Sequence, residues 1–445
     1  MQLIKLMTMS AIATALSINS CSASLTADVN KSINNSNVRR GCISVSIKSI
    51  ENSKIDYKLH DNTPIPPASI QKIVTTIPAI EVLGEDYKFQ TKLYKDKSNN
   101  YLIKLGADPY LTSDNLKDLT KGMPSEVNQI MIDDSIIDSV EWGEGWQWDD
   151  ALNPLMPKFS AYNIDNNLLT IILEATSNGA PANIYFKHEY PTTIINGLIT
   201  NKNINKFKIE EINDEITDAI GITGTIAKTQ NLSIPINNPK KYFKLRLIDA
   251  LLDNEVSNSG VYYSKRLDDT YTLVNTISHN LDNAKIDILK NSNNYVSETV
   301  FKLAGGKYKV GISSIDSAKQ MFEEYCNRNN LDFSQVNIVD ASGVSKNNLM
   351  VANFMSQFLL KNKDTLPSLL PTSSEGTLSN RLLYLKNNLR AKTGTLSNIS
   401  SIAGYITSKS SNKYVFCIMI NDSKSDSKDK KLLEDNIIKT IYLKG

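Results

Sequence analysis

The sequence is poor in histidine, cysteine and net charge, and each shortage excludes a class of function. Its 49 lysines and arginines nearly balance 47 aspartates and glutamates, a net charge of +2 over 445 residues, so we expect no nucleic-acid partner. The three histidines are His60, His188 and His279. None has another histidine or a cysteine at ligand spacing, and none lies in a recognisable Ser-His-Asp setting. We therefore expect no metal and no cofactor.

The sequence also lacks an apolar run long enough to cross a membrane. Lys5 precedes a short apolar stretch, roughly residues 6–18, which predicts a signal peptide over residues 1–23. Ile18-Asn19-Ser20-Cys21 resembles a bacterial lipoprotein cleavage box. A lipid anchor at Cys21 and ordinary cleavage near Ala23 both stay open. On either route we expect an exported protein of the periplasm or cell envelope.

Three cysteines remain after such processing, Cys42, Cys326 and Cys417, which allows at most one disulfide. Cys42 and Cys417 both lie in strand-like runs. We favour two buried, unpaired thiols that pack as small hydrophobic groups, while a Cys42–Cys417 pair stays open.

The texture of the chain predicts an α+β catalytic domain interrupted by a large insertion. Residues 24–38 are polar and rich in Asn and Ser, so we expect a flexible leader. Residues 39–89 and 261–445 carry strand-like runs at 41–50 and 414–420 and helical spacing between them. Residues 90–260 hold short strand-like pieces separated by turns, which predicts an inserted, mostly β region.

Ser69-Ile70-Gln71-Lys72 places a hydroxyl and an amine on one face at the start of an amphipathic helix over residues 70–83. Free backbone N–H groups at a helix start favour negative charge on the serine oxygen. A desolvated, neutral lysine can replace histidine as the base. Other Ser-x-x-Lys segments lie in polar stretches, and only Ser69 opens a long amphipathic helix. Taken alone, the pattern still favours a capped helix with a solvated lysine over a catalytic pair.

Lys392-Thr393-Gly394-Thr395 contains the only Lys-Thr-Gly in the sequence and precedes a strand-like run at 400–407. A glycine on an edge strand lets a substrate backbone approach. Lys392 would supply a cation for a substrate carboxylate and help to depress the pKa of Lys72. A hairpin turn with this sequence is the alternative.

Ser292-Asn293-Asn294 is a weak motif by itself, because the Ser-x-Asn pattern recurs elsewhere in the chain. Its position between the other two motifs, just before a helical run at 295–303, singles it out. Together the three motifs are the set of β-lactamases and penicillin-binding proteins. With the intervening segments, the chain resembles the penicillin-binding D-alanyl-D-alanine carboxypeptidase/endopeptidases. The intervening segments that carry this resemblance include Gly106-Ala107-Asp108-Pro109, Gly145-Trp146-Gln147-Trp148, Asp340-Ala341-Ser342-Gly343 and Gly376-Thr377-Leu378.

The resemblance implies a penicillin-binding/β-lactamase-like transpeptidase fold and a serine hydrolase that cuts the peptide stems of peptidoglycan after a D-alanine. It implies an acyl-enzyme on Ser69, Lys72 as base, Ser292 as proton relay and Asn294 as orienting residue. Lys392, Thr393, Gly394 and Thr395 would bind the substrate, and β-lactams would act as covalent inhibitors. A β-lactamase or esterase on the same fold, and a catalytically silent envelope-binding protein, are the alternatives.

Overall fold

The computed structural model describes residues 25–213, 218–263 and 268–445. The predicted signal peptide, with the candidate lipid site Cys21, lies outside these residues. No helix within the described ranges is long and apolar enough to span a membrane. The three cysteines in these ranges are free thiols: Cys326 and Cys417 are buried and Cys42 is half-buried.

A five-stranded antiparallel sheet joins the two ends of the chain. Its order is β14-β15-β16-β1-β2, and Cys417 of β16 pairs with Ser46 of β1 and with Ala403 of β15. Of the described residues between 90 and 260, none adds a strand to this sheet. The strands are β1 Ile43–Ser49, β2 Ile55–Leu59, β14 Leu389–Leu396, β15 Ile399–Thr407 and β16 Lys413–Asn421.

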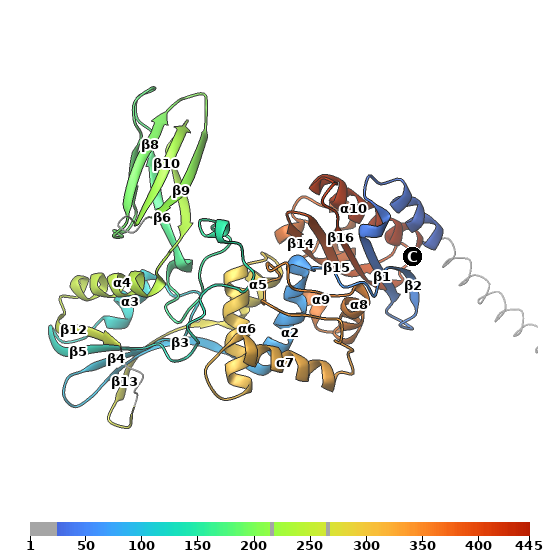
Figure 1. Ribbon diagram of the computed structural model, residues 1–445. Helices are drawn as coiled ribbons and strands as arrows, with labels where there is room; N and C mark the ends of the chain where they lie inside the picture. Colours follow the sequence, from blue (N-terminus) through green and yellow to red (C-terminus); the bar gives the residue numbers. More distant parts are fainter. Residues whose placement is uncertain (1–24, 214–217, 264–267) are drawn as a thin grey trace, which may run out of the picture.

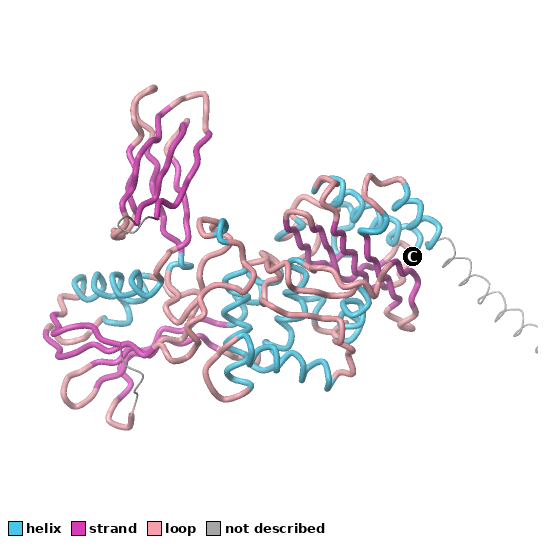
Figure 2. Tube along the Cα trace, in the orientation of Figure 1, coloured by secondary structure: helices cyan, strands magenta, loops and turns pink. Residues whose placement is uncertain are grey.

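Side chains alternate across the strands of this sheet and fill a separate core on each face. Along β16, Val415, Cys417 and Met419 enter one core, while Phe416 and Ile418 enter the other. Helices cover both faces (Figures 1 and 2), so the predicted α+β class is confirmed. The helices outside the insertion are α2 Gln71–Leu83, α5 Leu281–Leu289, α6 Asn294–Tyr308, α7 Ile315–Arg328, α8 Ala352–Lys361, α9 Leu366–Leu369 and α10 Ser427–Lys444.

The prediction of a flexible leader at 24–38 is wrong. Residues 25–34 form a helix, and Leu25, Val29 and Ile33 are at most 2% exposed in the core that also contains Ile437 of α10. A spacing of four residues puts these three side chains on one helical face. Their burial therefore orders a segment that its Asn- and Ser-rich composition suggested would be mobile.

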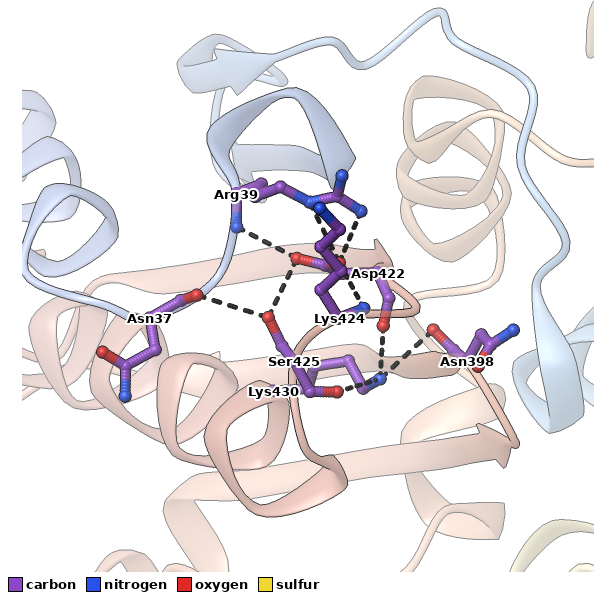
Figure 3. A network of polar contacts seen from close by, with 7 residues as sticks. All are labelled: Asn37, Arg39, Asn398, Asp422, Lys424, Ser425 and Lys430. Carbon is purple, nitrogen blue, oxygen red and sulfur yellow. Dashed lines mark hydrogen bonds and ion pairs between the residues drawn. The ribbon is translucent and has the colours of Figure 1, made fainter.

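Polar contacts fasten the end of this leader to the turn between β16 and α10 (Figure 3). The guanidinium of Arg39 donates to Asp422, with its terminal nitrogen 2.6 Å from Oδ1. Ser425 Oγ donates to Asp422 Oδ2 at 2.9 Å and lies 3.3 Å from the carbonyl oxygen of Asn37, which can share the same O–H. Asp422 has a fully buried side chain, so these donors replace the water that a carboxylate loses on burial.

The chain between α2 and α5 builds three further sheets. Their orders are β12-β5-β4-β3-β13, β11-β6-β7 and β8-β10-β9, and the last projects from the rest of the molecule (Figure 1). The elements are β3 Lys88–Lys95, β4 Tyr101–Lys104, α3 Ser113–Thr120, β5 Glu126–Asp133, β6 Leu168–Glu174, β7 Asn183–Phe186, β8 Thr193–Thr200, β9 Lys206–Asn213, β10 Asp218–Ile226, β11 Gln230–Pro235, α4 Pro239–Asp253, β12 Ser257–Tyr263 and β13 Thr272–Asn280.

The predicted insertion borders at residues 90 and 260 are too narrow. β13 pairs with β3 from Thr272 opposite Lys95 to Asn280 opposite Lys88, so residues 261–263 of β12 and 272–280 of β13 belong to the insertion and not to the catalytic domain. This pairing joins segments almost two hundred residues apart. Local sequence texture cannot reveal such a contact.

Candidate active site

Ser69 lies in η2 (Ala68–Ile70), a short 3₁₀ turn that leads directly into α2. The segment around Gly343 packs against this turn. Gly343 has a φ of +81°, and a Cβ atom there would lie 2.0 Å from the carbonyl oxygen of Ala68. Only glycine fits such a position, and it brings the loop that contains Ser342 against the serine turn.

Lys72 lies one turn after Ser69 and is 0% exposed. Its Nζ donates to Ser69 Oγ at 3.0 Å, to Asn294 Oδ1 at 2.7 Å and to the carbonyl oxygen of Ser342 at 2.7 Å. Burial lowers the pKa of Lys72 to about 7, against the opposing influence of Asp340 and Glu298. A lysine with this pKa is partly neutral near pH 7 and can accept a proton.

The Ser-x-Asn motif lies at the start of α6. Ser292 precedes the helix with a left-handed φ of 64°, and Asn294 is the first residue of α6. The amide of Asn294 accepts from Lys72 and donates through Nδ2 to the carbonyl of Leu155 at 2.9 Å. It therefore links the catalytic domain to a loop of the insertion.

Lys392 lies on β14, the edge strand of the five-stranded sheet, and is also 0% exposed. Its Nζ donates to Ser292 Oγ at 2.7 Å and to the carbonyl oxygen of Thr393 at 2.9 Å. Burial, and then the neighbouring charge of Lys72, hold the pKa of Lys392 well below its usual range. Burial is the main cause of the lowered pKa of Lys72, so the expected contribution of Lys392 is a secondary one.

Gly394 lets β14 lie against the serine turn. A Cβ atom at this position would come within 2.4 Å of Ser401 Oγ and 2.8 Å of the Ser69 backbone nitrogen. The absence of a side chain therefore leaves room beside the amide of Ser69, where an oxyanion can be bound.

These groups lie in or next to an open cleft of about 780 Å³. Five of the predicted residues line it, while Lys72 and Lys392 are buried next to lining residues. The predicted lining residues are Ser69, Ser292, Asn294, Thr393 and Thr395.

Other cleft residues were not assigned roles from the sequence. Thr377 lies 2.7 Å from Thr393, hydroxyl to hydroxyl, and Gln147, Asn153 and Leu155 come from a loop of the insertion. Gln147 and Thr377 stand in segments that carried the family resemblance, and that resemblance was their only signal.

The histidines lie away from this cleft, whose lining residues include none of them. His279 contacts Asp108 at 2.6 Å in the insertion. Within the described residues no group of three or more His, Cys, Asp or Glu side chains could hold a metal ion.

A serine beside a buried lysine at a helix start, next to an edge strand with Lys-Thr-Gly, is the arrangement of serine hydrolases that use lysine in place of histidine. A model of the D-Ala-D-Ala carboxypeptidase 3 (S13) family matches residues 25–440, and the chain belongs to this family. The predicted family and enzyme class, a serine-type D-Ala-D-Ala carboxypeptidase, are confirmed.

Similar proteins agree with this assignment. The chain is 24% identical to the D-alanyl-D-alanine carboxypeptidase DacB of Haemophilus influenzae, over 89% of this chain and 90% of that protein. It is 25% identical to the penicillin-sensitive carboxypeptidase A of Dictyostelium discoideum, over 84% of this chain and 81% of that protein. The crystal structure of penicillin binding protein 4 from Haemophilus influenzae superposes with a TM-score of 0.79 at 22% identity, covering 90% of this chain and 96% of that one. The predicted penicillin-binding fold is thereby confirmed.

Proposed function

We propose that the protein hydrolyses the peptide stems of peptidoglycan through an acyl-enzyme on Ser69. One observation carries the assignment of the nucleophile: the amine of Lys72 lies 3.0 Å from Ser69 Oγ, and burial brings its pKa to about 7. A general base needs this proximity and a pKa near the working pH.

In the first step, Ser69 Oγ attacks the carbonyl carbon of the penultimate D-alanine, and Lys72 accepts the hydroxyl proton. The backbone N–H groups of Ser69 and Thr395 stabilise the tetrahedral oxyanion; losing one such donor costs about 2.7–4 kcal/mol. Ser292 relays the proton that Lys72 accepted to the leaving amine, which departs as the C–N bond breaks and leaves Lys72 neutral again. The Ser292 hydroxyl is suited to this because it accepts from Lys392 and lines the cleft.

The substrate's carboxylate binds beside β14. Lys392 provides the cation, and the hydroxyls of Thr393 and Thr395 line the cleft next to it. Asn294 orients Lys72 through its Oδ1 atom. Water then hydrolyses the ester on Ser69 and releases the shortened stem.

The same steps cut a cross-link between stems, because that bond also follows a D-alanine and precedes an α-carboxylate. The openness of the cleft to loops of the insertion favours a substrate larger than a dipeptide. We therefore propose both carboxypeptidase and endopeptidase activity. The relative rates on a monomeric and a cross-linked muropeptide would measure the balance.

Penicillin acylation tests the assignment. β-Lactams mimic the scissile peptide, so intact-protein mass spectrometry should find one penicilloyl group, and peptide mapping should place it on Ser69. The Ser69→Ala variant should take up none. Labelling elsewhere would contradict the assignment, and rapid loss of the adduct with many turnovers would favour the β-lactamase alternative.

We also propose that the protein works in the cell envelope, where its substrate lies. Lipidation at Cys21 and cleavage near Ala23 give different products. Metabolic labelling with a radioactive fatty acid separates them: incorporation that is lost in Cys21→Ala indicates the lipid anchor, and its absence indicates ordinary cleavage.

A further inference from the structure

Glu298 is a buried carboxylate beneath the active site that the proposed reaction does not use. It lies on α6 four residues after Asn294, so both side chains project from the same helical face. Glu298 is 1% exposed. Within the described part of the chain, no lysine or arginine forms an ion pair with it.

Its two carboxylate oxygens hold two successive backbone amides. Oε2 accepts from the N–H of Ala341 at 3.0 Å and Oε1 from the N–H of Ser342 at 2.8 Å. The carbonyl of the same Ser342 accepts from Lys72 Nζ at 2.7 Å. Glu298 thus holds the peptide unit on the amino side of Ser342, the residue whose carbonyl is one of the three acceptors of Lys72. The peptide unit that contains this carbonyl is held on its other side by the N–H of Gly343, which donates to Asp340 Oδ1 at 2.6 Å.

A second acceptor of Lys72 comes from the same helix. Asn294 Oδ1 lies 2.7 Å from Lys72 Nζ, so one face of α6 controls two of the three contacts, Asn294 directly and Glu298 through Ser342. The third contact is the hydroxyl of Ser69. The direction of the amine toward that hydroxyl therefore depends on both residues of α6.

We propose that Glu298 is a positioning residue that holds Ser342 in place and thereby keeps the amine of Lys72 directed at Ser69. This inference rests on the proposed role of Lys72 as the base. Glu298 does not line the cleft, so it should affect the acylation rate and leave substrate binding unchanged.

The charge of Glu298 gives a second way to test this role, through its effect on the pKa of Lys72. The charged groups around it are Asp340, on the loop that it holds, and Lys72 on α2, with Lys392 on β14 beyond Lys72. Burial, and then Asp340, raise the pKa of Glu298 to about 7. When ionised, Glu298 raises the pKa of Lys72. Removing that charge should lower the pKa of Lys72, and neutral lysine would then persist to lower pH.

The test is the rate of penicillin acylation as a function of pH for wild type and Glu298→Gln. A glutamine has one acceptor oxygen, so it can satisfy only one of the two backbone amides. We expect acylation at the optimum to fall by about tenfold to a hundredfold, the size of effect that a small misplacement of a reacting group produces. With D-Ala-D-Ala peptides kcat should fall while KM stays unchanged. The acidic limb of the profile should move to lower pH.

Two further variants keep the test decisive. Glu434→Gln removes a buried carboxylate on α10 that binds Arg381 and lies outside the cleft lining. This control should lower the melting temperature and leave the acidic limb of the pH–rate profile unshifted. An equal limb shift in this control would overturn the proposal. Glu298→Asp keeps the charge and shortens the side chain, so acylation should slow without a limb shift. If Glu298→Gln does not fold, the acylation rate of Glu298→Asp tests the proposal instead.

The two possible failures are distinguishable. If wild type takes up no penicillin, or Lys72→Ala is acylated at the wild-type rate, the proposed function fails. If those proteins behave as proposed and both Glu298 variants are acylated like wild type, only the role of Glu298 is refuted.

Discussion

Replacing the substrate's terminal carboxylate by an amide tests the binding role of β14. Lys392 carries three N–H donors, and its acceptors among the described residues are Ser292 Oγ and the carbonyl of Thr393. One donor is left for an anion. The lysine is completely buried, so an anion there would meet a cation that water does not screen.

The size of the expected effect follows from the loss of one hydrogen bond to a charged group. A hydrogen bond to a charged group contributes about 1.5–3 kcal/mol. Since about 1.4 kcal/mol is a factor of ten, a peptide ending in D-alanine should exceed its amide in kcat/KM by about tenfold to 140-fold. Burial and Lys72 lower the pKa of Lys392, so its charge is lost as the pH rises. The preference for the acid should shrink in the same direction.

The assay is the release of D-alanine or D-alanine amide from otherwise identical peptides. Lys392→Ala should remove most of the preference, although it also disturbs Ser292. Lys430→Ala is the matched control, because Lys430 is a buried lysine that does not line the cleft and whose Nζ donates to three backbone carbonyls (Figure 3). It should lower stability and leave the ratio unchanged. Equal turnover of acid and amide by wild type would refute the carboxylate site.

Two predictions concern the leader. Ile33→Ala should reduce the free energy of unfolding by about 2–5 kcal/mol, as for other buried isoleucines, while Lys31→Ala on the exposed face of the same helix should not; equal denaturation midpoints would show that the helix contributes nothing. Hydrogen bonding from Arg39 depresses the pKa of Asp422, so its stabilising effect is present above the unfolded pKa of about 3.9 and lost as the pH falls toward the folded value. Asp422→Asn should therefore be less stable than wild type at pH 7, and a difference between the two melting temperatures that does not shrink as the pH falls below about 4 would contradict this.

The motifs of the site could be found from the sequence because each has a local signature. Ser69 opens an amphipathic helix, and Ser292 precedes another. In the structure, Ser292 lies 2.7 Å from Lys392 and Asn294 lies 2.7 Å from Lys72. The order of the motifs along the chain suggests that they meet, but it does not predict which side chains contact each other. Glu298 had a signal too, its spacing of four from Asn294. Its partners, the amides of Ala341 and Ser342, are backbone groups, and no residue type marks them.

The two errors had different causes. For the leader, composition was given more weight than spacing. Leu25, Val29 and Ile33 repeat every four residues, a helical signal that the surrounding Asn and Ser obscured. At the insertion border, β13 was missed because it is defined by its pairing with β3, and none of its nine residues is buried to mark a core-facing side.

The two buried lysines form one electrostatic system. The charge of Lys72 lowers the pKa of Lys392, and because such coupling is reciprocal, a proton on either lysine opposes a proton on the other. Glu298 and Asp340 lie on the side of Lys72 and favour its charged form. A carboxylate beside Lys392 favours the charged form there instead. Substrate binding therefore draws the proton toward β14 and leaves Lys72 neutral, the form that accepts the proton of Ser69. On this argument the carboxylate serves both to anchor the substrate and to prepare the base, so an amide substrate should lose kcat as well as affinity.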